Sequence, residues 1–178
     1  MIEVSAMSNG WLIALWFSVV GACIGSFANV VCHRLPIIRG LGKHSDGARL
    51  QRLIAKHGKY TLSHPRSSCP CCDTRIKIRY NVPVIGWVLS RGKCSACKKR
   101  IPFMYPGIEL LFAIAFGAYT WFEGLSLAGS MSFVMMFAGY CFIMIRHQTG
   151  RFDKSLVAVY LLAFVLQLGL TSLGFSGY

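Results

Sequence analysis

The stretch that decides the fold is Trp11–Val31, WLIALWFSVVGACIGSFANVV, which runs for 21 residues without a charged side chain. At about 1.5 Å of rise per helical residue, such a run covers about 30 Å, the thickness of the hydrocarbon core of a bilayer. It therefore predicts a membrane-spanning helix. Since Arg34 is the first charged residue after it, we expect its C-terminal end to face the cytoplasm and its N-terminal end to face outward.

Charge is distributed unevenly along the 178 residues, of which 54% are hydrophobic and 14% are charged. The formal net charge is +13, and 16 of the 19 Lys and Arg residues lie between positions 33 and 106. Basic loops stay on the cytoplasmic side of a membrane, whereas uncharged loops cross readily. A cytoplasmic loop is favoured over a nucleic-acid-binding one, because no recognition motif with interleaved aromatic residues accompanies the charge. We expect no nucleic-acid partner.

Three further apolar segments follow the basic region, at about 107–122, 125–145 and 155–173. Together with the first segment, they predict an all-α membrane protein with about four transmembrane helices and a cytoplasmic loop domain between the first two. Both termini are then expected outside the cytoplasm, with the lipid bilayer as the main solvent. The expected domains are 1–32, 33–106 and 107–178.

The basic loop contains one short helical pattern. Ser45 and Asp46 are residue types that cap helices, and the following residues place Leu50, Leu53 and Ile54 on one side. The other side carries the basic residues Arg49, Arg52 and Lys56. Such a segment fits a membrane-surface helix and an ordinary solvated helix equally well.

Two Cys-x-x-Cys pairs, Cys69 with Cys72 and Cys94 with Cys97, are separated by 21 residues in the basic loop. Each pair can present two thiolates from a tight turn, and two such turns close a tetrahedral cage around zinc. A reducing cytoplasmic loop favours metal binding over disulfides. Because four thiolates leave no open coordination position, the expected zinc ion is structural. Cys71 is the spare thiol.

Several phrases in the first two thirds of the chain are similar to those of the prepilin peptidase (type IV leader peptidase) family. Gly25–Pro36 reads GSFANVVCHRLP, and Cys69–Cys72 follows it in the order that the family shows. Next come Asn81–Trp87 (NVPVIGW) and Arg91–Cys97 (RGKCSAC), and then Tyr105–Leu110 (YPGIEL). These elements extend over about residues 20–112, and their order and spacing make a chance match improbable.

The resemblance implies an intramembrane aspartic protease in the inner membrane of a bacterium. Members of this family remove a short basic leader from type IV pilins and type II secretion pseudopilins at the cytoplasmic face. Many of them also methylate the new N-terminus with S-adenosylmethionine. The family cleaves with two aspartates, one in an Ile-Asp phrase that is followed by Pro-Asp, and one in a Gly-x-Gly-Asp phrase.

The sequence departs from this pattern at the aspartates. Ile143–Gln148 resembles the first aspartate phrase, but Met144 occupies the aspartate position. Asp153 resembles the aspartate of the downstream Pro-Asp, displaced by one residue. The Gly-x-Gly-Asp phrase has no counterpart in these 178 residues. An aspartic protease needs two carboxylates that share a proton. Glu109 and Asp153 could form such a pair, but this interpretation is less favoured. The favoured one places Glu109 in the first turn of a helix, where it pairs with a basic side chain.

Three functions fit these observations, and we favour a family member that does not cleave. It would bind a prepilin or pseudopilin, a true prepilin peptidase, or another component of a type IV pilus or type II secretion assembly. The second function is an active leader peptidase, alone or completed by a partner chain that supplies aspartates. The third keeps only methyl transfer or leader binding, with S-adenosylmethionine as cofactor for the former. The residues expected to contact a substrate or partner are Gly25, Ser26, Asn29, Arg34 and Glu109.

Overall fold

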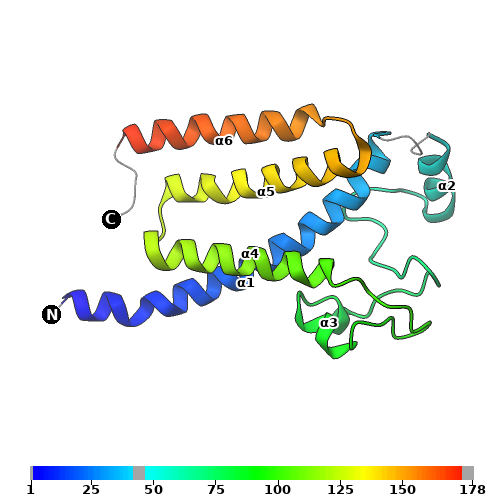
Figure 1. Ribbon diagram of the computed structural model, residues 1–178, viewed down its shortest axis with the longest axis horizontal. Coiled ribbons are helices and arrows are strands. Elements are labelled where there is room, and N and C mark those ends of the chain that lie inside the picture. The colour runs from blue at the N-terminus through cyan, green and yellow to red at the C-terminus, as the bar shows by residue number, and fades with distance from the viewer. Residues whose placement is uncertain (1, 42–46, 174–178) are drawn as a thin grey trace.

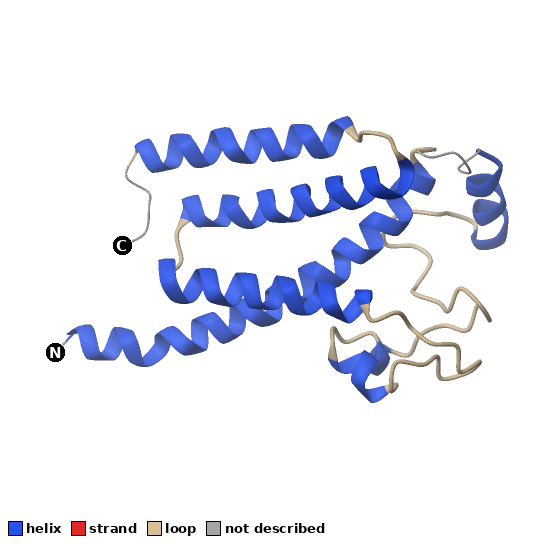
Figure 2. Ribbon diagram, in the orientation of Figure 1, coloured by secondary structure: helices blue, strands red, loops and turns tan. Residues whose placement is uncertain are grey.

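Helices account for the regular structure of the described part of the chain (Figure 2). The computed structural model describes residues 2–41 and 47–173. Within them no β-strand occurs beyond two isolated bridges, which confirms the predicted all-α class. The elements are α1 (Ile2–Ile38), α2 (Gly47–His57), the 3₁₀ turn η1 (Ile78–Tyr80), α3 (Ile85–Leu89), α4 (Met104–Glu123), α5 (Leu127–Thr149) and α6 (Lys154–Ser172).

Each predicted apolar segment forms a helix whose ends are set by local capping. α5 starts after Ser126, whose hydroxyl accepts a hydrogen bond from the backbone N–H of Gly129 at 2.9 Å. α5 ends at Gly150, where φ is 69°, a left-handed conformation that glycine adopts without a Cβ clash. α1 is longer than the predicted 11–31 run, since it starts at Ile2 and continues to Ile38.

The four long helices run side by side in alternating directions (Figure 1). α1 and α5 run toward one end of the molecule, and α4 and α6 run back, so the start of α1 lies at the same end as the end of α6. The segment that joins α1 to α4, which includes α2 and α3, lies at the opposite end. This alternation is what successive crossings of one layer require.

The core forms where α1 crosses α4 and α5. Gly21 and Gly25 make the crossing with α4 close: a Cβ on Gly21 would collide with the Phe112 carbonyl oxygen, and one on Gly25 would lie 2.9 Å from the Cα of Glu109. Gly21 and Gly25, four residues apart on α1, therefore serve close helix packing. Phe133 of α5 then stacks on Phe116 of α4, with ring centroids 3.9 Å apart.

Three helices are long and apolar enough to cross a membrane, over Gly10–Ile38, Leu127–Thr149 and Lys154–Ser172. α4 has 20 residues, which at about 1.5 Å per residue reach about 30 Å, but it falls outside this group. It includes Glu109 and Pro106, which lower its hydropathy. The predicted count of four spans is therefore not confirmed by length and composition.

α2 confirms the short helix predicted in the basic loop, although Ser45 and Asp46, its predicted cap, lie outside the described residues. None of its described residues is buried. Leu50 and Leu53 are half-buried, while Arg49 and Arg52 are exposed. The helix is tied to the cysteine region by an ion pair between Lys56 and Asp73.

Candidate functional site

The first cysteine pair lies on a tight backbone turn. The N–H of Cys69 donates to the carbonyl of Thr74 at 3.0 Å, and the N–H of Asp73 donates back to the carbonyl of Cys69 at 2.9 Å. An antiparallel bridge between Ser68 and Arg75 closes the base of the turn. Asp73 has a φ of 59°, which allows the chain to reverse within so few residues.

The second cysteine pair repeats this geometry. The N–H of Cys94 donates to the carbonyl of Lys99 at 2.9 Å, and the N–H of Lys98 donates to the carbonyl of Cys94 at 3.1 Å. A bridge between Lys93 and Arg100 closes the base, and Lys98 has the same φ of 59°. The two cysteine pairs are thus presented by equivalent turns, as their shared Cys-x-x-Cys spacing predicts.

The two turns bring four sulfur atoms together, those of Cys69, Cys72, Cys94 and Cys97, all within 4.8 Å of one another. The Sγ atoms of Cys69 and Cys97 are 3.7 Å apart, and those of Cys72 and Cys94 are 3.9 Å apart. A tetrahedral ion with Zn–S bonds of about 2.3 Å would place its sulfur ligands about 3.8 Å apart. Cys71 lies outside this group and is exposed.

The electrostatics of the four thiols also fit a cation. A hydrogen bond from the Thr74 side chain, with one from its backbone, lowers the pKa of Cys72 to about 6. The Lys99 backbone lowers the pKa of Cys97, but burial and the three neighbouring thiols raise it more, to about 12. Four thiolates repel one another unless a cation compensates them. The donor set and spacing therefore fit a structural divalent metal such as zinc.

The second turn is supported by an aromatic platform. Trp87 on α3 donates its Nε1–H to the carbonyl of Ile101 at 3.1 Å. Its ring packs with that of Phe103 in a T-shaped arrangement, with the ring centroids 5.7 Å apart. Gly92 packs against this indole, where a Cβ would come within 2.7 Å of the ring. The platform links the cysteine cluster to the start of α4.

Glu109 on α4 holds the start of α3. Its Oε2 accepts a hydrogen bond from the backbone N–H of Val84 at 2.6 Å. Val84 has a φ of 59°, an unfavourable conformation for a β-branched residue, and the carboxylate stabilises it. The predicted basic partner of Glu109 was wrong: its partner here is a backbone amide. Because α4 begins at Met104, Glu109 also lies in the second helical turn and not in the first.

Arg34 at the end of the family signature organises the loop that leads to the first cysteine pair. Its guanidinium donates to the carbonyls of Thr61 at 2.9 Å, Leu62 at 3.3 Å and Pro65 at 2.7 Å. It also lies over the ring of Tyr60, 5.4 Å from the centroid. One side chain on α1 therefore contacts four residues of this loop, which lie between positions 60 and 65.

The residues predicted to contact a substrate thus have structural partners in this chain. Asn29 donates to the carbonyl of Tyr105 at 3.2 Å, which joins α1 to the start of α4. Gly25 lies in the helix crossing, and Ser26 is half-buried beside it. A role of these residues in substrate binding stays a prediction.

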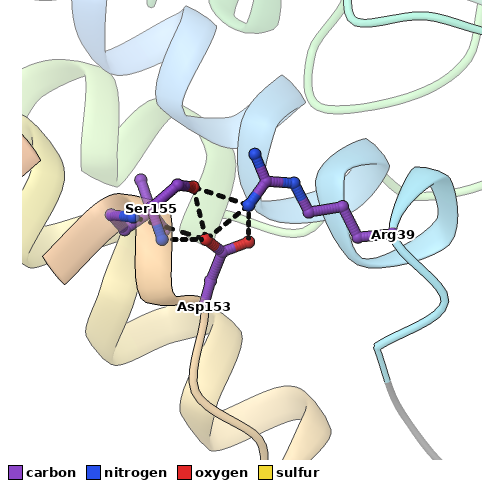
Figure 3. A network of polar contacts seen from close by, with 4 residues as sticks. Arg39, Asp153 and Ser155 are labelled. Carbon is purple, nitrogen blue, oxygen red and sulfur yellow. Dashed lines mark hydrogen bonds and ion pairs between the residues drawn. The ribbon is translucent and has the colours of Figure 1, made fainter. Parts of the chain in front are cut away.

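Asp153 lies at the centre of a network that joins the end of α1 to the start of α6 (Figure 3). Its carboxylate accepts from Arg39 at 2.7 and 2.8 Å, and it caps α6 by accepting from the backbone N–H of Ser155 at 2.9 Å and of Leu156 at 3.3 Å. The Asp153 side chain is 1% exposed, whereas that of Arg39 is 43% exposed. Asp153 is therefore a helix cap and an ion-pair partner.

The network keeps Asp153 ionised. Burial raises the pKa of Asp153, but the hydrogen bonds from Ser155 and Leu156 and the charge of Arg39 outweigh it, so its pKa lies below the usual range. A carboxyl whose folded pKa is lowered contributes stability above the unfolded pKa of about 3.9, and this contribution is lost as the pH falls through the folded pKa.

Replacing Arg39 by Met is expected to destabilise the protein. The buried Asp153 carboxylate would lose its charged donor, which costs about 1.5–3 kcal/mol. Asp153→Asn should lower the free energy of unfolding by less, because its amide oxygen can still cap α6. Its stability should also no longer include the fall at acid pH that protonation of the Asp153 carboxylate causes. Thermal unfolding in detergent micelles measures both variants.

The control is Arg151→Met, which removes a positive charge from the same loop, where the described residues contain no ion pair to Arg151. It should leave the unfolding midpoint nearly unchanged. Equal destabilisation by Arg39→Met and Arg151→Met would show that the network adds nothing beyond general charge.

Met144 is half-buried near the cytoplasm-facing end predicted for α5 and packs against the core cluster that includes Cys141 and Ile145. It has no ionisable group. The two acids considered as a catalytic pair, Glu109 and Asp153, are each bound to a different partner, Val84 and Arg39 respectively.

Comparison with known proteins decides the family. The model described as "Bacterial Peptidase A24 N-terminal domain" matches residues 19–122, more than half of the chain. This chain belongs to that family. A protein named prepilin leader peptidase/N-methyltransferase from Stutzerimonas stutzeri is 40% identical over 127 residues, which cover 70% of this chain and 44% of the relative.

Further relatives carry the same name. The one from Burkholderia pseudomallei is 38% identical over 143 residues, covering 78% of this chain and 46% of the relative, and the one from Pseudomonas aeruginosa is 35% identical over 116 residues, covering 64% and 40%. The matched regions span less than half the length of these curated relatives. No solved structure matches significantly. The family match includes both cysteine turns, Glu109 and the α1 signature, while Met144 and Asp153 lie beyond it.

Sequence reasoning missed several residues that build the site. No sequence signal identifies Arg39 as the partner of Asp153, because the two lie in distant segments. The same holds for Val84 and Glu109. Thr74, whose hydroxyl lies 3.3 Å from the sulfur of Cys72, could have been found from the repeat of the two turns. Trp87 was noted as part of a family phrase, without its role as a platform.

Proposed function

We propose that this chain is a prepilin-peptidase-like membrane protein that binds a component of a type IV pilus or type II secretion system without cleaving it. The observation that carries the proposal is Met144, which stands where the family resemblance places the first catalytic aspartate. A thioether can neither activate water nor share a proton, so this position supplies no acid–base chemistry.

The remaining acids near this end of the bundle support the same proposal. Asp153 is buried, ionised and bound to Arg39, and Glu109 is bound to the Val84 amide. A catalytic dyad needs two carboxylates close enough to share a proton. Because Asp153 and Glu109 are each bound to a separate partner, a structural role is favoured for both carboxylates.

The partner proposed first is a prepilin, which the names of the relatives give for those proteins, or a pseudopilin. The region 33–106 is strongly basic, so it repels a basic leader peptide at long range. Binding would then depend on shape and on interfacial polar groups such as Asn29. Incubation of the purified chain with a prepilin, followed by separate assays of binding and leader removal, tests the proposal: we expect binding and no cleavage.

Zinc is the metal that we propose for the cysteine cluster. Four thiolates at tetrahedral spacing suit it, and a structural role needs no redox change. The residues that would hold it are Cys69, Cys72, Cys94 and Cys97. When bound, the ion supplies a cross-link between the two turns in a region with few buried apolar side chains.

We further propose that α4 is a fourth membrane span, with the cysteine region and the α5–α6 loop in the cytoplasm. The alternating helix directions and the packing of α4 along α1 support this (Figure 1). Single cysteines at Pro102, Glu123 and Arg151 can be probed with an impermeant maleimide on intact spheroplasts. Glu123→Cys should react from outside, and Pro102→Cys and Arg151→Cys only after lysis.

The control is the same set of variants after lysis, where all three should react. Reaction of Pro102→Cys and Glu123→Cys from the same side would show that α4 does not cross. Reaction of Arg151→Cys from outside would reverse the proposed orientation of α5 and α6.

A further inference from the structure

The short helix α3 presents an apolar face that no described part of the chain covers. Val88 is 61% exposed, and Ile78 and Phe103 on either side of α3 in the sequence are 75% and 66% exposed. Ile85 and Leu89 of the same helix are exposed as well. Ile85, Val88 and Leu89 are spaced so that they share one side of α3, and we call these three side chains the α3 apolar face. In a region that otherwise holds most of the basic residues, a patch of this kind indicates contact with a nonaqueous partner.

Contacts with α4 fix the position of α3. The N-terminal end of α3 is bound through Val84 to Glu109 at 2.6 Å, and Trp87 contacts Phe103 at the other side. Glu109 lies five residues after Met104, the first residue of α4, which corresponds to about 7–8 Å along the helix axis. α3 is therefore held beside the first two turns of α4, as Figure 1 shows.

α4 carries an exposed apolar stripe that starts directly after Glu109, the residue that holds α3. Leu110, Leu111 and Ile114 of α4 are exposed, while Phe112 and Phe116 on its other side are buried in the core. If α4 crosses the bilayer, this stripe contacts lipid. A neighbouring apolar face at the level of the first two turns then lies where headgroups meet acyl chains.

We infer that α3 is an interfacial helix, which rests in the cytoplasmic leaflet with its apolar face toward the acyl chains. The exposed Arg79 and Arg91, which flank the helix in the sequence, are placed to meet lipid phosphates. The cysteine cluster, linked to α3 through Trp87, is thereby seated on the membrane surface. This inference rests on the proposed crossing of α4 but is independent of whether the chain cleaves a prepilin.

α2 provides a contrast within the same region. It is also amphipathic and basic, but it lies beyond the end of the long helices and away from α4 (Figure 1). Its Lys56 pairs with Asp73 of the first cysteine turn. Gln51 is an exposed residue of this helix, and a probe there compares α3 with an amphipathic helix that is tied to the first cysteine turn instead of to α4.

Photocross-linking tests the inference. The photoreactive residue p-benzoylphenylalanine is introduced at Val88, at Ile114 and at Gln51 in separate variants. Each protein is reconstituted into vesicles of phosphatidylethanolamine and phosphatidylglycerol and irradiated. We expect the mass of the protein to increase by one phospholipid in the Val88 and Ile114 variants, and to stay unchanged in the Gln51 variant. Zinc content equal to that of the unmodified chain confirms that each variant is folded, and a second probe at Leu89 should repeat the Val88 result.

The outcomes separate the inference from its premise. Lipid adducts at Ile114 but not at Val88 or Leu89 would overturn the placement of α3. An absence of adducts at Ile114 as well would overturn the crossing of α4 and the inference with it. A prepilin adduct at Val88 that replaces the lipid adduct when prepilin is added would identify the face as a protein-docking surface and overturn the lipid assignment.

Discussion

Cys94→Ser is expected to abolish tight metal binding and to open the cysteine region. Structural zinc sites with four ligands contribute about 10–16 kcal/mol of apparent binding free energy, so that loss of one thiolate weakens binding by orders of magnitude. The sulfur atoms of Cys94 and Cys72 are 3.9 Å apart, and each turn depends on the other to complete the cage. Metal analysis after dialysis against a chelator should give about one zinc per wild-type chain and almost none in the variant.

The matched control is Cys71→Ser, which removes a thiol from the same turn but outside the cluster. It should retain one zinc and remain resistant to trypsin. In Cys94→Ser, trypsin should cleave near Lys98 and Lys99, because their turn loses its cross-link. Retention of zinc in Cys94→Ser, or its loss in Cys71→Ser, would contradict the proposed ligand set. Iron in place of zinc would leave the ligands intact and correct the metal.

The sequence allowed the helices and the cysteine cluster to be predicted, because both follow from local rules. An uncharged run such as Trp11–Val31 has to satisfy its backbone groups internally in lipid, and a helix does so. The Cys-x-x-Cys spacing specifies a turn by itself, and two such turns need each other to complete a tetrahedral site. The four sulfur atoms consequently lie together although 21 residues separate the pairs.

The partners of the acidic residues could not be predicted, because they depend on how distant segments meet. Glu109 was expected to pair with a basic side chain, and a region rich in Lys and Arg offered many. The structure instead gives it the amide of Val84, whose unfavourable φ of 59° requires a fixed partner. Arg39 and Asp153 are 114 positions apart, and only the packing of α1, α5 and α6 brings them together.

The chain is expected not to cleave the leader from a prepilin. Purified wild-type protein, incubated with a matched prepilin in liposomes, is expected to leave the leader in place. Loss of one member of a catalytic unit commonly lowers the rate by about 10⁴–10⁶-fold, which is below detection in such an assay. The prepilin leader peptidase/N-methyltransferase of Stutzerimonas stutzeri serves as the positive control, since its name includes this activity.

Met144→Asp tests whether the missing carboxylate is the sole defect, with Met144→Asn as the matched control that has the same shape without the charge. We expect no cleavage from either, because Asp153 is held by Arg39 and Glu109 by Val84, and neither is free to share a proton. A carboxylate at position 144 would also lie beside the core cluster, so unfolding midpoints are needed to show that the variant is folded. Cleavage by Met144→Asp but not by Met144→Asn would reveal a second acid in this chain.

Asp153→Asn identifies that acid if cleavage is seen. In the wild type the substitution should change stability alone, since Asp153 caps α6 and pairs with Arg39. Leader removal by the wild type that disappears in Asp153→Asn, while Arg39→Met retains it at equal or greater destabilisation, would make Asp153 a catalytic carboxylate. That result would overturn the proposal of a non-cleaving protein, because destabilisation by Arg39→Met separates loss of the fold from loss of the acid.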